Sequence, residues 1–145
     1  MNNQKNIVLC GVGGQGTVLA SKLLAAAAMS KDIPVMSAET IGMAQRGGSV
    51  FSHLRMGDNL YSPMIETGTA DLIIGFEPGE TVRMLPYLKD HGHIVVSTRA
   101  VKPVTATLSG SDYDAPQMLE YLKAAVPNLT LVNADQACAD IGSSK

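Results

Sequence analysis

The chain has 145 residues, which is the size of one domain. Its formal net charge at pH 7 is -2, so it has no excess of positive charge that would attract nucleic acid. Its two cysteines, Cys10 and Cys138, lie far apart without a C-x-x-C pair, so neither a zinc site nor an iron-sulfur cluster is expected, and no metal site is predicted. A polar segment, residues 2–6, precedes no long apolar run, which predicts a cytoplasmic protein without a signal peptide or a membrane span.

The most informative segment is residues 7–17, where an apolar run ends in a cluster of glycines and an alanine-rich segment follows. This order predicts a strand, a phosphate-binding loop and a helix that begins near Thr17. Gly11, Gly13 and Gly16 fit the G-x-G-x-x-G spacing, in which bare backbone N–H groups approach an anion at the positive end of the helix dipole. The alternative is that these glycines only let the strand and the helix pack closely.

Beyond the loop, residues 17–29 have the composition of a buried helix that lies against a sheet, with Lys22 as their only charge. Strands are predicted at residues 33–38 and 49–56, and residues 60–62 are placed to pair back on the second of them as a β-hairpin. The later elements are helices at 77–88 and 114–125, strands at 70–76, 93–97 and 128–132, and an extended piece at 105–108.

This alternation predicts an α/β fold with a Rossmann-like, doubly wound and mostly parallel sheet covered by helices on both faces. The whole chain, residues 1–145, is predicted to be a single domain. A further helix begins near Ala134, and the sequence stops before that helix could finish packing. A C-terminal helical portion is therefore expected to be missing, and the alternative is a frayed natural terminus.

A second segment, residues 39–55, places charge, amide and glycine after the second predicted strand. Doubly wound geometry puts the end of that strand beside the glycine loop, so Glu39, Gln45 and Arg46 are expected to converge on a ligand there. Arg46, followed by Gly47 and Gly48, offers a guanidinium beside exposed amides, which suits a phosphate or a carboxylate. The alternatives are that Arg46 pairs with Glu39 and pins the loop, or that Glu39 binds an adenosine ribose.

The remaining candidates point to structure rather than to catalysis. Cys10 is predicted to be a small buried residue, and Glu77 to cap a helix or meet a partner. His91 and His93 lack a third ligand and are expected in a surface loop, while Arg55 either reaches an anion or is solvated. No Ser-His-Asp set or catalytic carboxylate pair is present in the sequence pattern, so the chain is not expected to be catalytic alone.

Two segments together, residues 11–16 and 39–55, closely resemble the gamma-type domain of the 2-oxoacid:ferredoxin oxidoreductases. The residues that carry the resemblance are Gly11-Val12-Gly13-Gly14-Gln15-Gly16 in the first segment, and Glu39-Thr40 with Gln45-Arg46-Gly47-Gly48-Ser49-Val50 in the second. Within the family, the chain is most similar to the beta subunit of the indolepyruvate enzymes. The likeness continues through residues 70–77 to the C-terminal end.

The resemblance implies a reaction in which an aryl 2-oxoacid such as indolepyruvate and CoA give acyl-CoA, CO2 and reduced ferredoxin. Thiamine diphosphate, magnesium and [4Fe-4S] clusters are then expected on a large partner subunit, and ferredoxin accepts the electrons of the complex. This chain is expected to aid CoA handling or assembly. The residues expected to contact CoA or another nucleotide are Gly11, Gly13, Gly14, Gln15, Gly16, Thr17, Glu39, Gln45, Arg46, Gly47 and Gly48.

Two other functions stay open at the level of sequence. The glycine spacing also suits a free-standing dinucleotide-binding oxidoreductase, although no substrate domain accompanies it. A purely structural assembly subunit, whose glycine loop binds no ligand and fits against the thiamine-bearing chain, is the third alternative.

Overall fold

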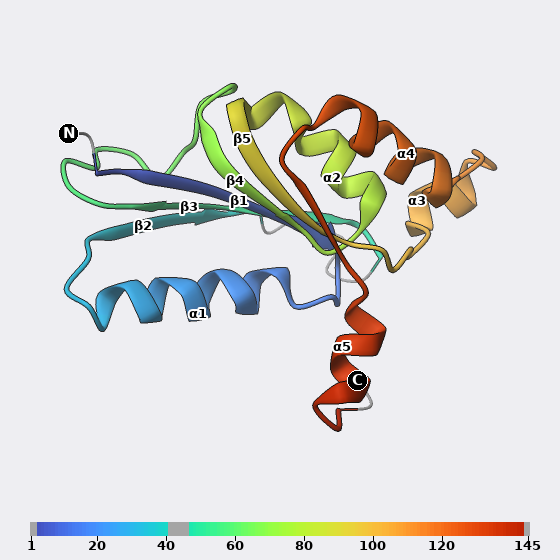
Figure 1. The fold of residues 1–145 in the computed structure, drawn as a ribbon, viewed down its shortest axis with the longest axis horizontal. Helices are drawn as coiled ribbons and strands as arrows, with labels where there is room; N and C mark the ends of the chain where they lie inside the picture. The colour runs from blue at the N-terminus through green and yellow to red at the C-terminus, as the bar shows by residue number, and fades with distance from the viewer. Residues whose placement is uncertain (1–2, 41–46, 144–145) are drawn as a thin grey trace.

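The computed structural model describes residues 3–40 and 47–143 and shows a mixed six-stranded sheet in the order β2-β3-β1-β4-β5-β6 (Figure 1). The strands are β1 (Lys5–Val12), β2 (Val35–Glu39), β3 (Ser49–Met56), β4 (Ala70–Gly75), β5 (Leu88–Ser97) and β6 (Leu129–Val132). The helices are α1 (Thr17–Met29), α2 (Pro78–Met84), the 3-10 turn η1 (Leu85–Tyr87), α3 (Val104–Leu108), α4 (Ala115–Ala125) and α5 (Ala134–Asp140). The predicted α/β fold is confirmed.

Most of the sheet is parallel. The pairs β1/β4, β4/β5 and β5/β6 run parallel, and only β3 runs antiparallel, to both of its neighbours. The chain leaves β1 toward β2 on one side and leaves β4 toward β5 on the other. The carboxyl ends of β1 and β4 therefore mark the point where a doubly wound sheet usually takes its ligand.

Helices cover both faces of the sheet, as predicted. Helix α1 packs against β1, β2 and β3, while α2 covers the opposite face with α4 beside it (Figure 1). Alternate residues of β1 serve the two cores, because successive side chains of a strand point to opposite faces. Val8 packs with Ile73 and Leu122 on the α2 side, and Leu9 packs with Leu54 on the α1 side.

Helix α1 has the predicted bounds, but it is not buried on all sides. Leu19 and Leu23 are each 62% exposed on the face that points away from the sheet, whereas Thr17, Ser21 and Ala28 are buried. The sequence alone could not distinguish the buried face of α1 from its exposed face, because the apolar residues of the helix are spread around its whole circumference. The prediction of a buried helix is therefore wrong for the face that carries Leu19 and Leu23.

The predicted β-hairpin is wrong. Residues 60–62 form no strand, because β1 and β2 already occupy the two edges of β3. Residues 105–108 were predicted to be extended, but they belong to α3. The N–H of Thr107 donates back to the carbonyl of Pro103 at 3.2 Å, and a proline ahead of the first turn favours a helical start.

The helix predicted over residues 77–88 is shorter than expected. Helix α2 ends at Met84 and continues as η1, which contains Pro86, a residue without an N–H to extend the helical ladder. Strand β5 then begins at Leu88, earlier than predicted. Helix α4 ends at the predicted Ala125, and Asp114 caps it by accepting the N–H of Gln117 at 3.0 Å.

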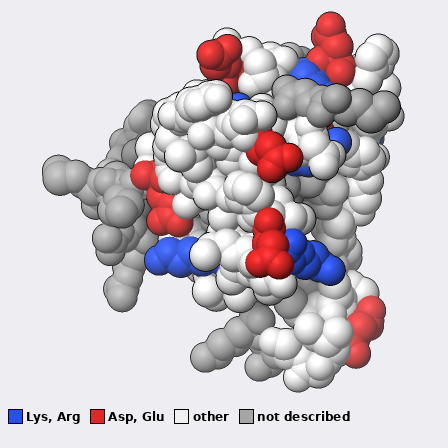
Figure 2. Space-filling view, turned by 90° about the vertical axis from the view of Figure 1, so that its left-hand side faces the viewer, with Lys and Arg blue, Asp and Glu red and all other residues white. Residues whose placement is uncertain are grey.

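Two observations concern the surface. None of the helices in the described ranges is long and apolar enough to cross a membrane. On the face shown in Figure 2, basic and acidic side chains are interspersed. That face therefore presents no field of a single sign that would steer a polyanion.

Candidate functional site

The glycine loop lies between β1 and α1, at the carboxyl end of the central strand. Gly14 and Gly16 have φ values of +98° and +87°, which side chains other than glycine rarely adopt. Gly11 has a different role: a Cβ there would lie 2.8 Å from Thr17 Oγ1 and 2.9 Å from Phe76 Cβ. The close-packing alternative therefore explains Gly11, while the loop conformation itself requires Gly14 and Gly16.

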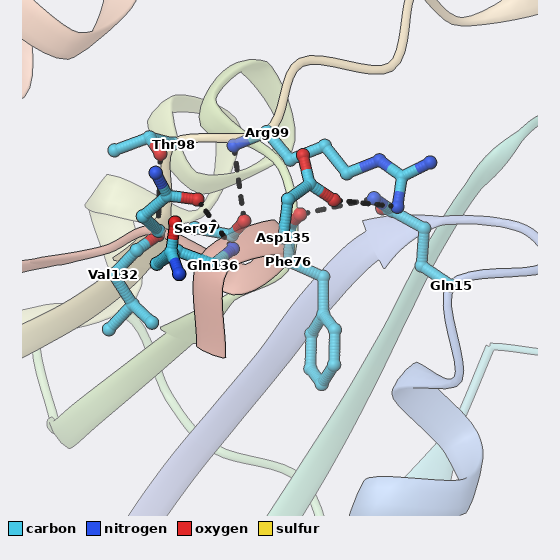
Figure 3. Close-up of polar contacts among 9 residues, drawn as sticks. Gln15, Phe76, Ser97, Thr98, Arg99, Val132, Asp135 and Gln136 are labelled. Atoms are coloured by element: carbon cyan, nitrogen blue, oxygen red, sulfur yellow. Dashed lines mark hydrogen bonds and ion pairs between the residues drawn. The ribbon is translucent and has the colours of Figure 1, made fainter. Parts of the chain in front are cut away.

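Several backbone amides of this loop are already bonded within the protein. The N–H of Val12 donates to Gln15 Oε1 at 2.7 Å, and the N–H of Gly13 donates to the carbonyl of Gly48 at 2.7 Å. Gln15 Nε2 also donates to the carbonyl of Phe76 at 3.1 Å (Figure 3). Gln15 therefore ties the loop to the end of β4, and both the oxygen and the nitrogen of its carboxamide are hydrogen-bonded within the protein.

The first turn of α1 is the open part of the loop. Helix α1 follows Gly16, which has no side chain to cap the leading N–H groups, and no side-chain cap is formed. An uncapped helix start carries a partial positive charge, which favours an anion. A bound anion would therefore meet the α1 terminus rather than the amides of Val12 and Gly13.

A pocket of about 350 Å³ opens beside this turn. It brings the glycine loop together with the end of β2, as the sequence predicts, although β3 lies between β1 and β2. The lining residues are Val12, Gly13, Gly14, Gly16, Thr17, Val18, Leu19, Lys22, Glu39, Thr40 and Val50. The volume falls within the range of small-molecule sites.

Lys22 is the charged residue among the described pocket residues that sequence analysis missed. It is exposed, lines the pocket together with Glu39, and forms no ion pair within residues 3–40 and 47–143. The available signal was its position as the only charge on α1, roughly one helical turn beyond Thr17. Among the described residues, the pocket lining thus includes one cation, Lys22, and one carboxylate, Glu39.

The second predicted segment contributes its glycines to the wall of the loop. The N–H of Gly13 donates to the carbonyl of Gly48. In return, the N–H of Gly47 donates to the carbonyl of Gly13 at 3.4 Å. Gly47 has a φ of +77°, and the N–H of Val104 on α3 donates to its carbonyl at 3.0 Å. Gln45 and Arg46 lie outside the described residues, so their predicted contacts stay predictions.

Two buried glutamates lie behind the loop. Glu77 follows β4 and is fully buried, and its Oε2 accepts the N–H of Glu80 at 2.9 Å, which confirms the predicted helix cap. Burial raises the pKa of Glu77 to about 7, against the lowering effect of that hydrogen bond. Glu80 is 2% exposed, and its Oε2 accepts a hydrogen bond from Ser49 Oγ at 2.5 Å.

The other predicted candidates have structural roles. Cys10 is fully buried, and burial raises the pKa of its thiol to about 12, so it is not poised for reaction. Arg55 is partly buried and donates to Asn6 Oδ1 at 3.0 Å and to the carbonyl of Ser62 at 2.8 Å. His91 and His93 are exposed, but the predicted surface loop is wrong, because both residues lie in β5.

A polar cluster at the ends of β5 and β6 was not predicted. Arg99 Nη1 lies 3.1 Å from Asp135 Oδ1, and Thr98 Oγ1 donates to the carbonyl of Val132 at 3.4 Å (Figure 3). Both partners of the ion pair are more than half exposed, so the pair contributes little to stability. In the part of the chain that is described, no group of three or more His, Cys, Asp or Glu residues is arranged to hold a metal ion.

Known proteins resemble this chain over nearly all of its length. The family model for pyruvate ferredoxin/flavodoxin oxidoreductase matches residues 6–145. Indolepyruvate oxidoreductase subunit IorB of Archaeoglobus fulgidus is 39% identical over 95% of this chain and 69% of its own length, and its namesake in Methanothermobacter thermautotrophicus is 36% identical over 94% of this chain and 70% of its own.

A solved structure supports the fold. The gamma subunit of a keto/oxoacid ferredoxin oxidoreductase from Geobacter sulfurreducens matches with a TM-score of 0.65 over 98% of this chain and 68% of that chain, at 20% identity. At 20% identity, the similarity to this structure shows only a shared fold. The family match and the identities above are stronger, and they show that the chain belongs to the pyruvate ferredoxin/flavodoxin oxidoreductase family.

Proposed function

We propose that this chain is the small, gamma-type subunit of a cytoplasmic 2-oxoacid:ferredoxin oxidoreductase that acts on an aryl 2-oxoacid such as indolepyruvate. The observation that carries the proposal is the 39% identity to an indolepyruvate oxidoreductase subunit over 95% of the chain. In the proposed reaction the C1–C2 bond of the 2-oxoacid breaks and CO2 leaves. C2 becomes bonded to the sulfur of CoA, the thiol proton is released, and two electrons pass to ferredoxin.

The redox cofactors are assigned to a larger partner subunit. A [4Fe-4S] cluster needs four thiolates, whereas this chain has two cysteines, of which Cys10 is buried beneath Thr81. The residues present therefore do not fit a cluster. We assign thiamine diphosphate and magnesium to the same partner, and ferredoxin is proposed as the electron acceptor of the complex.

The proposed contribution of this chain is to hold CoA in the pocket beside α1. The open N-terminus of α1 and the Lys22 ammonium suit phosphate groups, and Glu39 suits the hydroxyl groups of a ribose. Gly14 and Gly16 allow the ligand to approach the backbone closely. A thiol held in place raises the rate chiefly through orientation, which requires no catalytic side chain on this chain.

The dinucleotide-binding alternative is less well supported. In a dinucleotide site the pyrophosphate approaches the glycine loop near the switch point of the sheet. Here the Gln15 side chain lies between Val12 and Phe76 and takes up the hydrogen-bonding groups of both. A titration with NAD is expected to give no stoichiometric binding.

The assembly role is a second candidate, favoured by the exposed apolar face of α1. Leu19 and Leu23 are both 62% exposed on the longest helix of the described chain. Apolar side chains of this size are common at permanent subunit contacts. If assembly is the only role, Leu23→Ser reduces recovery of the complex, whereas pocket variants leave the dependence on CoA unchanged.

The experiment is co-purification of the natural partner, followed by dye reduction that depends on indolepyruvate and CoA. In the active complex, Lys22→Met is expected to raise the KM for CoA about tenfold, through loss of a charge-assisted contact, while Lys31→Met serves as the matched control outside the pocket. Arg46→Ala is expected to weaken CoA use by more than about tenfold. An unchanged KM in both variants would remove CoA from this pocket.

A further inference from the structure

We infer that Glu80 is a positioning residue for the glycine-loop pocket, and that it acts through Ser49 from the opposite face of the sheet. The inference rests on the proposed function, since it concerns how the proposed CoA pocket keeps its shape. Glu80 lies on α2 and does not line the pocket. Helix α1, which does line it, packs on the other face.

The connection begins at a buried hydrogen bond. Ser49 Oγ donates to Glu80 Oε2 at 2.5 Å, and the Glu80 side chain is 2% exposed. A buried carboxylate is costly unless it accepts hydrogen bonds, so this bond is a strong constraint on both residues. The other partner of Glu80, Arg83, lies at 3.6 Å and is 64% exposed, so it contributes far less.

The constraint passes from Ser49 to the loop along the backbone. Ser49 is the first residue of β3 and is paired with Val12, the last residue of β1. The preceding residue, Gly48, accepts the N–H of Gly13 at 2.7 Å, and the next residue, Val50, lines the pocket. A shift of Ser49 therefore moves Val50, which lines one wall of the pocket. It also weakens the hydrogen bond from Gly13, in the other wall, to Gly48.

Helix capping does not account for the Glu80 side chain. Capping of α2 is performed by the Glu77 carboxylate, which accepts the backbone N–H of Glu80. The Glu80 carboxylate instead reaches the start of a strand that lies two positions away from β4 in the sheet. Its position is explained by the strand that it holds.

The first test measures hydrogen exchange on the isolated chain, in Ser49→Ala, Glu80→Ala and Glu80→Gln. The Gly13 amide is expected to exchange at least about tenfold faster in the two alanine variants, the effect of losing one charge-assisted hydrogen bond. The Ile94 amide, bonded to Asn128 at 2.9 Å in the β5/β6 region, is expected to keep its rate. Glu80→Gln retains an acceptor and is expected to preserve Gly13 protection.

Arg83→Ala is the matched control, because it removes the other partner of Glu80 and leaves the Ser49 bond intact. In the reconstituted complex, Ser49→Ala is expected to raise the KM for CoA about fivefold, with kcat and the KM for the 2-oxoacid unchanged. Glu80→Gln is expected to keep the wild-type KM, as is Arg83→Ala. This pattern separates positioning from a general loss of stability.

Two results would overturn the inference. One is unchanged exchange at Gly13 in Ser49→Ala, a variant that is informative even if Glu80→Ala does not fold. The other is equal acceleration at Gly13 and Ile94, which would indicate global destabilisation. If the wild-type complex proves independent of CoA, the proposed function fails, and exchange at Gly13 still decides whether Glu80 positions the loop.

Discussion

Gln15 Nε2 donates a hydrogen bond to the main-chain oxygen of Phe76 at 3.1 Å, and this bond joins the glycine loop to the end of β4. The two residues lie at the carboxyl ends of neighbouring parallel strands, where doubly wound proteins usually bind a ligand. In this protein, the Gln15 side chain is hydrogen-bonded to the backbone groups at that point. The candidate pocket lies instead on the α1 side.

Replacing Gln15 tests this internal bridge. Gln15→Leu is expected to lower the free energy of unfolding by about 1–3 kcal/mol, because the Val12 N–H and the Phe76 carbonyl both lose their partner. Urea denaturation measures the change, with the exposed Gln117→Leu as control. Equal midpoints for Gln15→Leu and wild type would show that water replaces both bonds without cost.

Gly47 and Gly68 form a matched pair for testing the close approach of α3. Both have a left-handed φ, +77° and +74°, but a Cβ at Gly47 would lie 2.3 Å from Val104 Cγ2, whereas one at Gly68 would meet nothing within 4 Å. Gly68→Ala is expected to cost about 1–2 kcal/mol, the left-handed penalty alone. Gly47→Ala is expected to cost about 1–3 kcal/mol more, through overpacking.

A double-variant cycle separates these two costs. Adding Val104→Ala to Gly47→Ala is expected to recover most of the excess, because it removes the clashing methyl groups. Thermal or urea unfolding of the variants gives the coupling energy. A coupling energy near zero would mean that α3 moves away freely.

Because of His53, the free energy of unfolding is expected to fall as the pH is lowered. Its ring is 1% exposed, Nδ1 accepts the N–H of Ile65 at 2.9 Å, and burial lowers the pKa below the ordinary 6.5. The unfolded chain therefore takes up a proton that the folded chain does not. Stability that is present above pH 6.5 is lost as the pH falls further, by at most about 1.4 kcal/mol per pH unit.

The readout is the difference in unfolding free energy between wild type and His53→Gln across pH 5 to 8. The difference is expected to change with pH below about 6.5. His93→Gln, which removes an exposed ring, is the matched control. A constant difference would show that His53 titrates alike in the folded and unfolded chains.

Because of Glu77, the free energy of unfolding is expected to fall as the pH is raised, which is the opposite of the effect of His53. Its pKa is raised to about 7, so the neutral acid is the form that the fold favours. Its contribution to stability is fully present below pH 4.5 and is lost as the pH rises through about 7. Glu77→Gln retains an acceptor for the Glu80 N–H and cannot ionise, so the loss of stability between pH 6 and 8 is expected to be absent.

Unfolding curves at pH 6, 7 and 8 for wild type and Glu77→Gln test this expectation. Glu66→Gln, at an exposed position, controls for the general effect of removing a carboxylate. Parallel pH profiles for wild type and Glu77→Gln would contradict the raised pKa.

Local sequence patterns were sufficient for most elements of the fold. The glycine loop and the bounds of α1 followed from Gly16 and Thr17, because a glycine cluster between apolar and alanine-rich segments has few other solutions. The cap of α4 followed from Asp114. The convergence of Glu39 with the glycine loop also followed, since carboxyl ends of parallel strands share one edge of a sheet.

Tertiary structure alone decided what the polar groups at that edge do. No spacing in the sequence indicates that the Gln15 side chain is turned inward, that Lys22 lines the pocket, or that Ser49 meets Glu80 across 31 positions. Strand pairing depends on long-range contacts, so the insertion of antiparallel β3 between β1 and β2 was also invisible locally. Hydrophobic periodicity is a property of one segment, whereas the partner of a buried polar atom belongs to the assembled fold.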